Sequence, residues 1–424
     1  MVIGYILYNI LIIKYSITFY GKKVNPISLY SYVWCTIVLL YELKWIEYYD
    51  LTLQTWTILF MSQTAYVMGC YLATKITLNN YQMKKDYAIY EKDAESYIFG
   101  VIVLITIISG IVILLNVFQY FSIFGYNLLS QTNELYSYRL SGSQGISKIP
   151  YIGVFIYIAM IFSAVYTVNY GFKKFFIIPF LLIILDELTS GGRASLVLAP
   201  LMFFGVFFAA DLKVKLSKIQ IGSIVLGIFL LFISISSNRT AGIYNIYSSD
   251  LFKKMTNDNV TFYKIIEYIT SPLGTLNAFL ASPTFSFGGN TFMTIYSILN
   301  KLGYNIEILL YQEDFYVPMR VNVGTMLREI IEDFMFPGAI LVLILTGFIF
   351  SKSYLIFNQT YSYLSGLWVA VLFQIISFSF FDWRMRSSAE WIILFFGSLI
   401  GYFLDYKLEK RKNNKYEKNV RNIN

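Results

Sequence analysis

The stretch 320–333 reads RVNVGTMLREIIED, and it decides how the chain is organised. It closes the segment 238–335, the one long segment between two strongly apolar runs that is not itself lipid-soluble. The flanking runs, 219–237 and 334–351, have the length and composition of membrane-spanning helices. The sequence therefore predicts a polar segment that a hydrophobic frame holds at one face of a membrane.

Composition excludes a soluble globular domain. The 424 residues are 57% hydrophobic and 14% charged, whereas soluble domains carry roughly 25% charged residues. The expected fold class is an all-α polytopic membrane protein, with about 11 transmembrane helices and one large external loop that contains short amphipathic helices. The expected spans are 2–20, 26–42, 53–74, 96–117, 150–170, 175–190, 194–210, 219–237, 334–351, 361–381 and 388–405.

The distribution of charge predicts the domain organisation and the orientation. Lys-rich breaks alternate with Arg-bearing breaks along the chain, and the positive-inside rule puts the Lys-rich set in the cytoplasm. The N-terminus is then outside and the C-terminus cytoplasmic. Residues 1–237 hold about eight transmembrane helices and 334–405 about three more. Residues 238–333 form the external loop, where the catalytic residues are expected, and 406–424 form a basic cytoplasmic tail. The net charge of +8 reflects orientation, so no nucleic acid partner is expected.

The absence of histidine restricts the chemistry. The chain has no His, so mechanisms with a His base, a Ser–His pair or His metal ligands are excluded. Phosphate-loop and dinucleotide-binding patterns are also absent. No metal and no cofactor are expected.

A short turn at 186–195, DELTSGGRAS, is a candidate anion site. Arg193 follows two glycines and opens the next span, where backbone N–H groups and the helix dipole favour a phosphate. Glu187 is placed to orient that arginine. The alternative is a tight interhelical turn whose Arg reaches the lipid headgroups.

The stretch 320–333 is a candidate catalytic helix. In a helix, Arg328 and Glu332 lie four residues apart on one face, and Glu329 and Asp333 on an adjacent face. Two facing carboxylates near apolar surface raise one pKa, and such a group can act as a general base for a hydroxyl nucleophile. The alternative is a solvated amphipathic helix with one ordinary ion pair.

Two further stretches contain aromatic residues. The turn 382–386, DWRMR, places Arg384 beside a Trp, which suits an anionic, sugar-bearing headgroup or an interfacial anchor. The stretch 263–287 is aromatic-rich and contains Ser271–Pro272, which predicts a break between amphipathic segments on the membrane plane. The alternative for the second stretch is ordinary packing.

Five short motifs are spread along the chain: Asn25-Pro-Ile-Ser-Leu with Trp34, Ser190-Gly-Gly-Arg193, Ser271-Pro-Leu with Phe279, Phe287-Gly-Gly-Asn-Thr-Phe292, and Asn322-Val leading through Arg328 to Asp333-Phe334 and Gly338. In these motifs, and chiefly in its layout, the chain resembles the Wzy-type oligosaccharide repeat-unit polymerases of bacterial O-antigen and capsule synthesis. The resemblance covers nearly the whole chain. The chain departs from the expected pattern at Met335, where a glycine is expected, and at Pro337.

The resemblance implies an inverting, metal-independent glycosyltransferase of the bacterial cytoplasmic (inner) membrane. The growing glycan leaves one undecaprenyl pyrophosphate and joins the next lipid-linked repeat unit at the outer face. The expected partners are undecaprenyl-pyrophosphate-linked oligosaccharide, membrane lipid, a chain-length regulator and a flippase. External Arg residues would stabilise the leaving pyrophosphate.

The expected site residues follow from these stretches and from the resemblance. The expected catalytic residues are Asp333 or Glu329 as the base, with Arg328 and Arg193 on the pyrophosphate. The expected substrate-binding residues are Arg320, Arg239, Arg384, Glu187 and Asn322.

Two alternative functions share the membrane layout. An O-antigen ligase has a similar arrangement of spans and a large external loop, but ligases often rely on an external His, which this chain lacks. A lipid-linked oligosaccharide flippase or other transporter should carry charges along the membrane midplane. Here Lys14 is the one charge well inside an expected span, which favours chemistry at the membrane surface.

Overall fold

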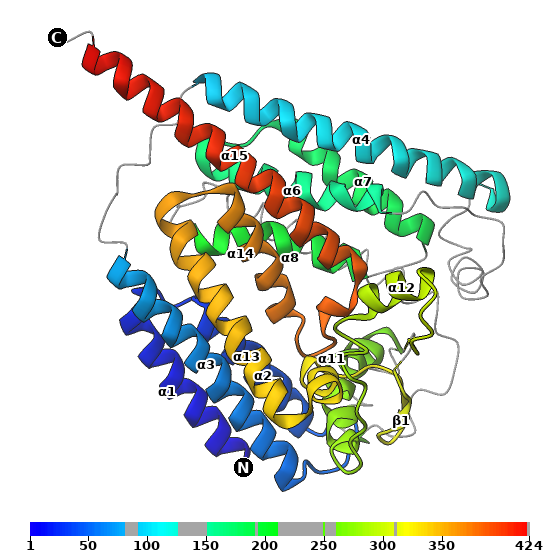
Figure 1. The fold of residues 1–424 in the computed structure, drawn as a ribbon. Coiled ribbons are helices and arrows are strands. Elements are labelled where there is room, and N and C mark those ends of the chain that lie inside the picture. Colours follow the sequence, from blue (N-terminus) through cyan, green and yellow to red (C-terminus); the bar gives the residue numbers. More distant parts are fainter. Residues whose placement is uncertain are drawn as a thin grey trace. The chain divides into compact units, whose positions relative to one another are not determined.

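The computed structural model describes residues 1–80, 92–125, 151–190, 194–210, 249–250, 260–308 and 312–421. These residues are predominantly helical, with one two-stranded ribbon (Figure 1). The chain divides into two compact units. Unit 1 comprises Met1–Asn79, Phe229–Lys352 and Leu372–Trp391, and unit 2 comprises Asn80–Ile228, Ser353–Val371 and Ile392–Asn424.

Each unit is a bundle of helices. The elements of unit 1 are α1 (Val2–Tyr20), α2 (Pro26–Glu42), α3 (Leu53–Asn80, except its last residue), α11 (Val260–Phe279), α12 (Met293–Lys301), β1 (Phe315–Tyr316), β2 (Arg320–Val321) and η3 (Arg384–Arg386). Those of unit 2 are α4 (Lys92–Phe124), η1 (Ile152–Val154), α6 (Phe155–Tyr170), η2 (Lys174–Phe176), α7 (Ile177–Ser190) and α8 (Ala194–Ala209). Three further helices are divided between the two units: α13 (Met326–Thr360), α14 (Tyr363–Ser377) and α15 (Ser388–Arg421).

The bounds of α1 and α2 follow from local sequence. Gly21 ends α1 in the left-handed conformation, with φ of 65°, which glycine adopts without a steric cost. Asn25 then starts α2: its side chain accepts from the backbone N–H of Ser28, whose hydroxyl accepts in return from the backbone of Asn25. Pro26 occupies the first helical position, where no N–H is needed. The predicted helices at 2–20 and 26–42 are confirmed.

In unit 1, α3 and α13 run side by side in close contact (Figure 1). A Cβ added at Gly69 would lie 2.0 Å from the Ile344 carbonyl oxygen, and one at Gly347 would lie 2.3 Å from the Tyr66 carbonyl oxygen. Small residues allow helix backbones to approach in this way within a membrane. The Ser351 hydroxyl donates to the carbonyl of Cys70 at 3.2 Å, which adds a polar contact between the same two helices.

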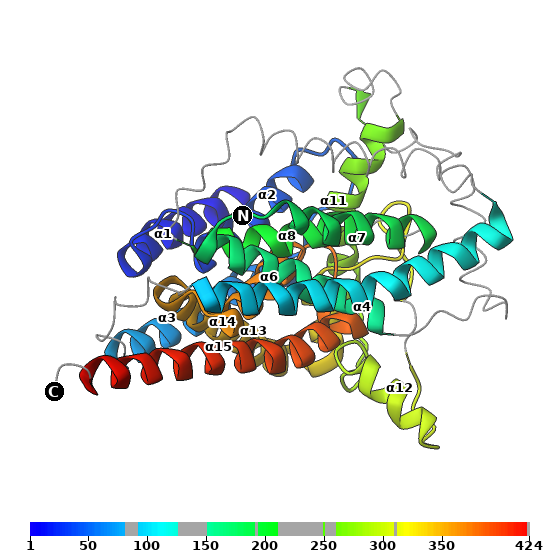
Figure 2. The ribbon, with the colours of Figure 1, turned by 90° about the horizontal axis from the view of Figure 1, so that it is seen from above.

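In unit 2, α4 packs against α6 and α7, and α8 packs against the same two helices (Figure 2). Polar contacts connect the helix ends of unit 2. The Tyr166 hydroxyl donates to Glu95 at 2.8 Å, and Lys173 forms an ion pair with the same carboxylate at 2.9 Å. Asp405 of α15 accepts from the backbone N–H groups of Tyr363 and Leu364, and so caps the start of α14.

The structure supports an all-α membrane-embedded protein but does not give the predicted count of about eleven spans. Five helices within the described ranges are long and apolar enough to cross a membrane: Val2–Tyr20, Ala94–Ile123, Ile152–Tyr170, Met326–Thr360 and Ser388–Lys410. Ser195–Ala209 and Tyr363–Ser377 are apolar but shorter. The expected span 26–42 forms a helix of only 17 residues, and 219–237 lies outside the described residues.

One predicted break is wrong. The helix α11 continues through Ser271–Pro272, where a break was predicted, and its residues from Thr270 to Asn277 are buried, which favours ordinary packing for this stretch. The helix α13 begins at Met326, before the span expected from residue 334, and has non-helical backbone at Met335. The helix α15 continues beyond the expected span and includes most of the predicted tail, as far as Arg421.

Candidate functional site

The candidate site is built around the first part of α13. Thr325 precedes the helix, and its hydroxyl accepts from the backbone N–H of Arg328 at 3.1 Å, as an N-cap does. The helix is broken at Met335, whose φ is 57° and ψ is −179°. Residues 326–334 therefore form a short helix of their own, which we call the site helix. Met335 takes a backbone conformation that suits glycine, which is the residue expected there from the resemblance.

The charged residues of the site helix are buried. Arg328 and Asp333 are each 1% exposed, and Glu329 is 0% exposed. The alternative of a solvated amphipathic helix is therefore wrong. Buried charges require partners or they are strongly unfavourable, so the surroundings of each of these three side chains indicate what it does.

The direct contacts of the Arg328 guanidinium are with rings and neutral acceptors, while the carboxylates of Glu332, Glu329 and Glu313 act on its charge from further away. The guanidinium lies 4.6 Å from the ring centroid of Phe315 and 5.7 Å from that of Phe279. Nη2 donates to the carbonyl of Glu313 at 3.0 Å, and Nη1 donates to Oε1 of Gln312 at 3.4 Å. The buried Nε has no partner among the described residues. The guanidinium thus has rings and neutral acceptors around it, and it keeps donor capacity for an anion.

Gly324 makes room for this arginine. A Cβ added at Gly324 would lie 2.6 Å from Cδ of Arg328 and 2.9 Å from Oε1 of Gln312. Both distances are shorter than the contact distances that Cβ atoms make in proteins. The glycine at this position therefore allows Arg328 and Gln312 to meet.

A depression of about 520 Å³ adjoins these residues, lined by Gln312, Asp314, Arg320 and Asn322. The ribbon β1–β2 forms one side, with Tyr316 paired to Arg320 across it. Arg320 donates from Nε to Asp314 at 2.8 Å, and this hydrogen bond raises the pKa of Arg320 above its ordinary value. Arg320 and Asn322, both predicted to bind substrate, therefore line one cavity, and Gln312 joins that cavity to Arg328.

Glu329 connects the site helix to the turn between α14 and α15. Its Oε2 accepts from the backbone N–H of Trp383 at 2.5 Å, and its Oε1 lies 3.3 Å from Nη1 of Arg386. The backbone N–H of Met326 also donates to the carbonyl of Ser379 at 2.8 Å. The structure therefore brings together two stretches that the sequence analysis treated separately.

Asp333 organises the loop at 286–291. Its two carboxylate oxygens accept from the backbone N–H groups of Asn290 and Thr291 at 2.8 and 2.6 Å. They also accept from three side chains: Ser286, Asn290 and Thr291. A carboxylate with five donors has little capacity left for a substrate proton, so the contacts of Asp333 indicate a structural role.

Arg384 is held between two carboxylates. It lies 2.9 Å from Asp382 and 3.0 Å from Glu390. Burial alone would lower the pKa of Arg384, but the two carboxylates raise it well above its ordinary value. Burial raises the pKa of Asp382, while Arg384 opposes that shift. Because its charge is already neutralised, Arg384 is less suited than Arg328 to bind a phosphate.

The remaining predicted residues are Glu187, Arg193 and Arg239. Glu187 belongs to unit 2, where its carboxylate accepts from the backbone N–H of Ser195 at 3.1 Å and so caps the start of α8. Arg193 and Arg239 lie outside the described residues. In the part of the chain that the structure describes, no three acidic or cysteine side chains are grouped as metal ligands would be.

The predicted site residues did not include Gln312 or Arg386. Arg386 shares its turn with Arg384, so the motif at 382–386 carried a signal for it. Gln312 has no such signal, because its role depends on contacts with residues further along the chain. The same is true of the pairing between Glu329 and Trp383.

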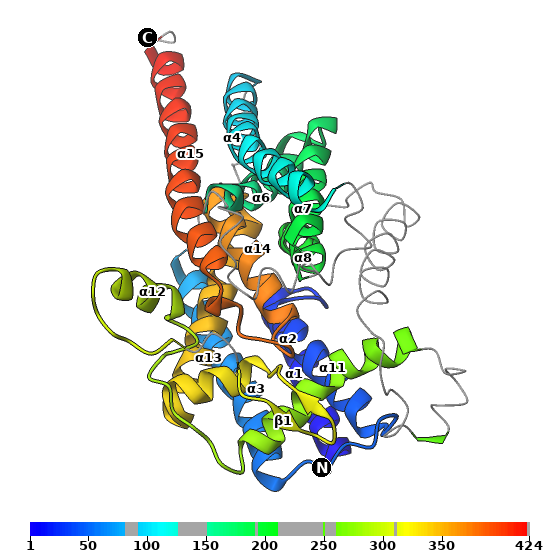
Figure 3. The same cartoon turned by 90° about the vertical axis from the view of Figure 1, so that its right-hand side faces the viewer.

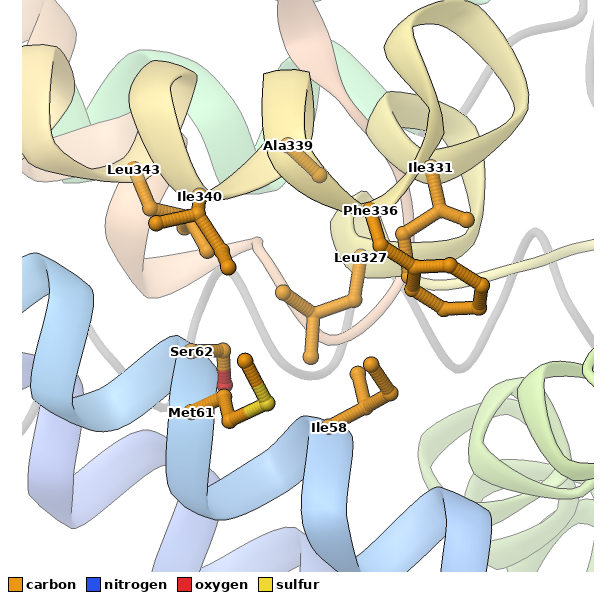
Figure 4. Close-up of a pocket in the computed structure, with 9 residues that line it drawn as sticks. All are labelled: Ile58, Met61, Ser62, Leu327, Ile331, Phe336, Ala339, Ile340 and Leu343. Carbon is orange, nitrogen blue, oxygen red and sulfur yellow. The ribbon is translucent and has the colours of Figure 1, made fainter.

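The opposite face of the site helix lines an apolar pocket of about 80 Å³ (Figure 4). Leu327 and Ile331 of the site helix point into this pocket, and Ile58 and Met61 of α3 face them. The rest of the lining is Ser62, Phe336, Ala339, Ile340 and Leu343. One short helix therefore separates an apolar pocket from a buried charged cluster.

Comparison of the chain with protein-family models, with curated proteins and with solved structures finds no match.

Proposed function

We propose that this protein is a glycosyltransferase that polymerises oligosaccharide repeat units carried on undecaprenyl pyrophosphate. The observation that carries the proposal is the setting of Arg328. It is a buried guanidinium whose hydrogen bonds go to neutral acceptors and whose Nε has no partner among the described residues, and Gln312 links it to the depression that Arg320 and Asn322 line. This arrangement suits a bulky anion with oxygen acceptors, such as a pyrophosphate.

The apolar pocket supports a lipid-linked substrate. A carrier lipid needs an apolar surface beside the phosphate site, and Leu327 and Arg328 are consecutive residues on different faces of the site helix. The pocket contains one polar side chain, Ser62, whose hydroxyl donates to the Leu59 carbonyl. If a hydrocarbon chain replaces water in this pocket, the Ser62 hydroxyl therefore keeps its hydrogen bond to Leu59.

In the proposed entry of the pyrophosphate, an anion displaces the Gln312 amide. The hydrogen bond between Gln312 and Nη1 of Arg328 is 3.4 Å long, which is weak for a charged donor. A phosphate oxygen accepts from Arg328 more strongly than a neutral amide does. Arg320 reaches the same depression from β2, where it forms an ion pair with Asp314, so in this proposal a phosphate oxygen competes with that carboxylate for Arg320.

In the proposed reaction, a hydroxyl oxygen of the acceptor sugar bonds to the anomeric carbon of the donor glycan. The bond from that carbon to the pyrophosphate oxygen breaks, and its electron pair leaves with the pyrophosphate. Arg328 and Arg320 stabilise the developing negative charge. Glu329 takes the hydroxyl proton, and Arg386, 3.3 Å away, stabilises the carboxylate before the transfer.

In the proposed topology, the N-terminus is outside, the basic C-terminal end is cytoplasmic and the site faces the outer side of the cytoplasmic membrane. The excess of Lys in one set of breaks supports this orientation. The product is O-antigen or capsular polysaccharide, and no metal enters the proposed reaction.

Deletion of the gene and gel analysis of lipid-linked glycans test this function. The polymerase predicts that single repeat units accumulate, capped but unpolymerised. Full-length polymer that stays on undecaprenyl pyrophosphate would identify a ligase instead. Repeat units confined to the cytoplasmic face would identify a flippase, and the proposal would then be wrong.

A further inference from the structure

The helix α12 and the loop before it present an apolar surface. No residue of α12 is buried, and Figures 2 and 3 show the helix at the edge of unit 1. The exposed apolar side chains are Phe285, Phe287, Ile295, Ile298, Leu302 and Tyr304. We call these six residues the apolar rim. Such a concentration of exposed large apolar residues indicates an interaction surface.

The rim follows the periodicity of the helix. Ile295, Ile298 and Leu302 are three and then four residues apart, so they lie on one side of α12 and its end. The polar residues lie on the other side, and two of them, Ser297 and Asn300, have local partners. The Ser297 hydroxyl donates to the Met293 carbonyl at 2.8 Å, and Asn300 bonds the backbone of the following loop. The exposed face is therefore the apolar one.

The base of α12 is fixed to the site helix. The backbone N–H groups of Ser286 and Gly288 donate to the carbonyls of Glu332 and Asp333 at 2.8 and 3.1 Å. Phe292, which precedes α12, lies 6.0 Å from Phe334, ring centroid to ring centroid. These contacts hold the rim beside the point where the apolar part of α13 begins.

The apolar part of α13 continues this surface. Met335, Leu341 and Leu345 are all exposed on α13, within the range Met326–Thr360 that is long and apolar enough to cross a membrane. In a membrane, exposed leucines of such a helix contact lipid. The rim is thus fixed beside the start of a helix that is long and apolar enough to cross a membrane.

We propose that the apolar rim lies in the membrane interface and contacts phospholipid, so that α12 anchors the loop 286–291 at the membrane surface. The rim contains three aromatic residues, a type enriched where headgroups meet hydrocarbon. Lys301 is exposed at the end of α12, where it can reach a lipid phosphate. The anchor holds the loop that Asp333 organises, and this inference does not depend on the proposed function.

Fluorescence quenching in lipid nanodiscs tests the anchor. The full-length protein carries Cys35→Ala, while Cys70 is fully buried and is left in place. An environment-sensitive fluorophore is attached at Ile298→Cys or, as the matched control on the polar face, at Ser297→Cys. The unmodified parent chain measures background labelling, and Leu302→Cys repeats the measurement at a second rim position.

The label at Ile298 is expected ~5–10 Å below the headgroup surface, so lipid-borne quenchers near the headgroups reach it. Iodide in water is expected to quench this label about threefold less than the label at Ser297. Equal iodide quenching at the two positions would show that the rim faces water. Oxidative crosslinking of Ile298→Cys between two copies would show a second chain on the rim. Either result overturns the proposal. If the Ile298→Cys variant misfolds, the same two measurements are made on Leu302→Cys.

Discussion

Replacing Arg328 with Gln should abolish polymerisation while leaving the fold in place. The variant loses two hydrogen bonds from a charged donor, worth about 1.5–3 kcal/mol each, and cation–π contacts worth ~1–2 kcal/mol. It also removes a buried charge that makes no close ion pair among the described residues, and that charge costs several kcal/mol to desolvate. These contributions to the free energy of unfolding oppose each other, so we expect a net change within about 2 kcal/mol. The loss of transition-state stabilisation has no such compensation and should reduce the rate by about 10²–10³-fold.

The assay uses the purified protein in nanodiscs with lipid-linked repeat units, and it reads polymer length on a gel over time. Thermal unfolding of the same sample measures stability. Lys264→Gln is the matched control, because Lys264 is a cation of unit 1 that forms a short-range ion pair with Glu267 at 2.6 Å. The control should polymerise at the parent rate. Near-normal polymer from a folded Arg328→Gln protein would refute the reasoning.

Arg328→Lys separates charge from geometry. Lysine keeps the positive charge but has no planar fork with which to hold two oxygens. We expect a rate between those of the parent and Arg328→Gln, with most of the loss in kcat. A fully active Lys variant would mean that a point charge is sufficient and that the orientation of the guanidinium by Phe315 and Glu313 does not matter.

Four further substitutions test other parts of the site. Glu329→Gln should lower the rate by about 10²–10⁴-fold with Tm little changed, and an active variant would exclude Glu329 as the base. Asp333→Ala should cost about 3 kcal/mol or more and make the loop 286–291 sensitive to protease, whereas a merely inactive but stable variant would contradict its structural role. Met335→Gly should raise stability by about 1 kcal/mol by relieving the positive φ, measured as a higher Tm. Gly347→Ala should lower it by about 1–3 kcal/mol, because the added methyl would lie 2.3 Å from the Tyr66 carbonyl oxygen; an unchanged Tm would show that α3 and α13 adjust freely.

The sequence predicts helix ends well where a local cap is present. Gly21 and Asn25 bracket the junction of α1 and α2, and both predicted bounds match the structure. Where no cap exists, hydropathy marks the lipid-soluble part of a helix and not its end. The helix α4 was expected at 96–117 but runs over Lys92–Phe124, because polar and interfacial residues continue the same helix at both ends.

The candidate site was only partly predictable for a similar reason. The four-residue spacing of Glu329 and Asp333 is a local pattern, and it correctly places them on adjoining turns of one helix. Their different roles depend on residues far away in the sequence: Trp383 and Arg386 for Glu329, and the loop 286–291 for Asp333. A pattern within one helix cannot distinguish two carboxylates whose partners come from other segments.

The break at Met335 connects these observations. A straight helix of the 35 residues of α13 would be about 52 Å long, well beyond the ~30 Å hydrocarbon layer. Its first turns carry Arg328 and Glu329, which lipid would not tolerate. The positive φ at Met335 interrupts the helix at the junction, so the charged turns can pack against Trp383 and Phe315 while the following residues remain apolar. The strained residue therefore allows one continuous stretch of chain to serve both a buried charged cluster and a membrane-embedded helix.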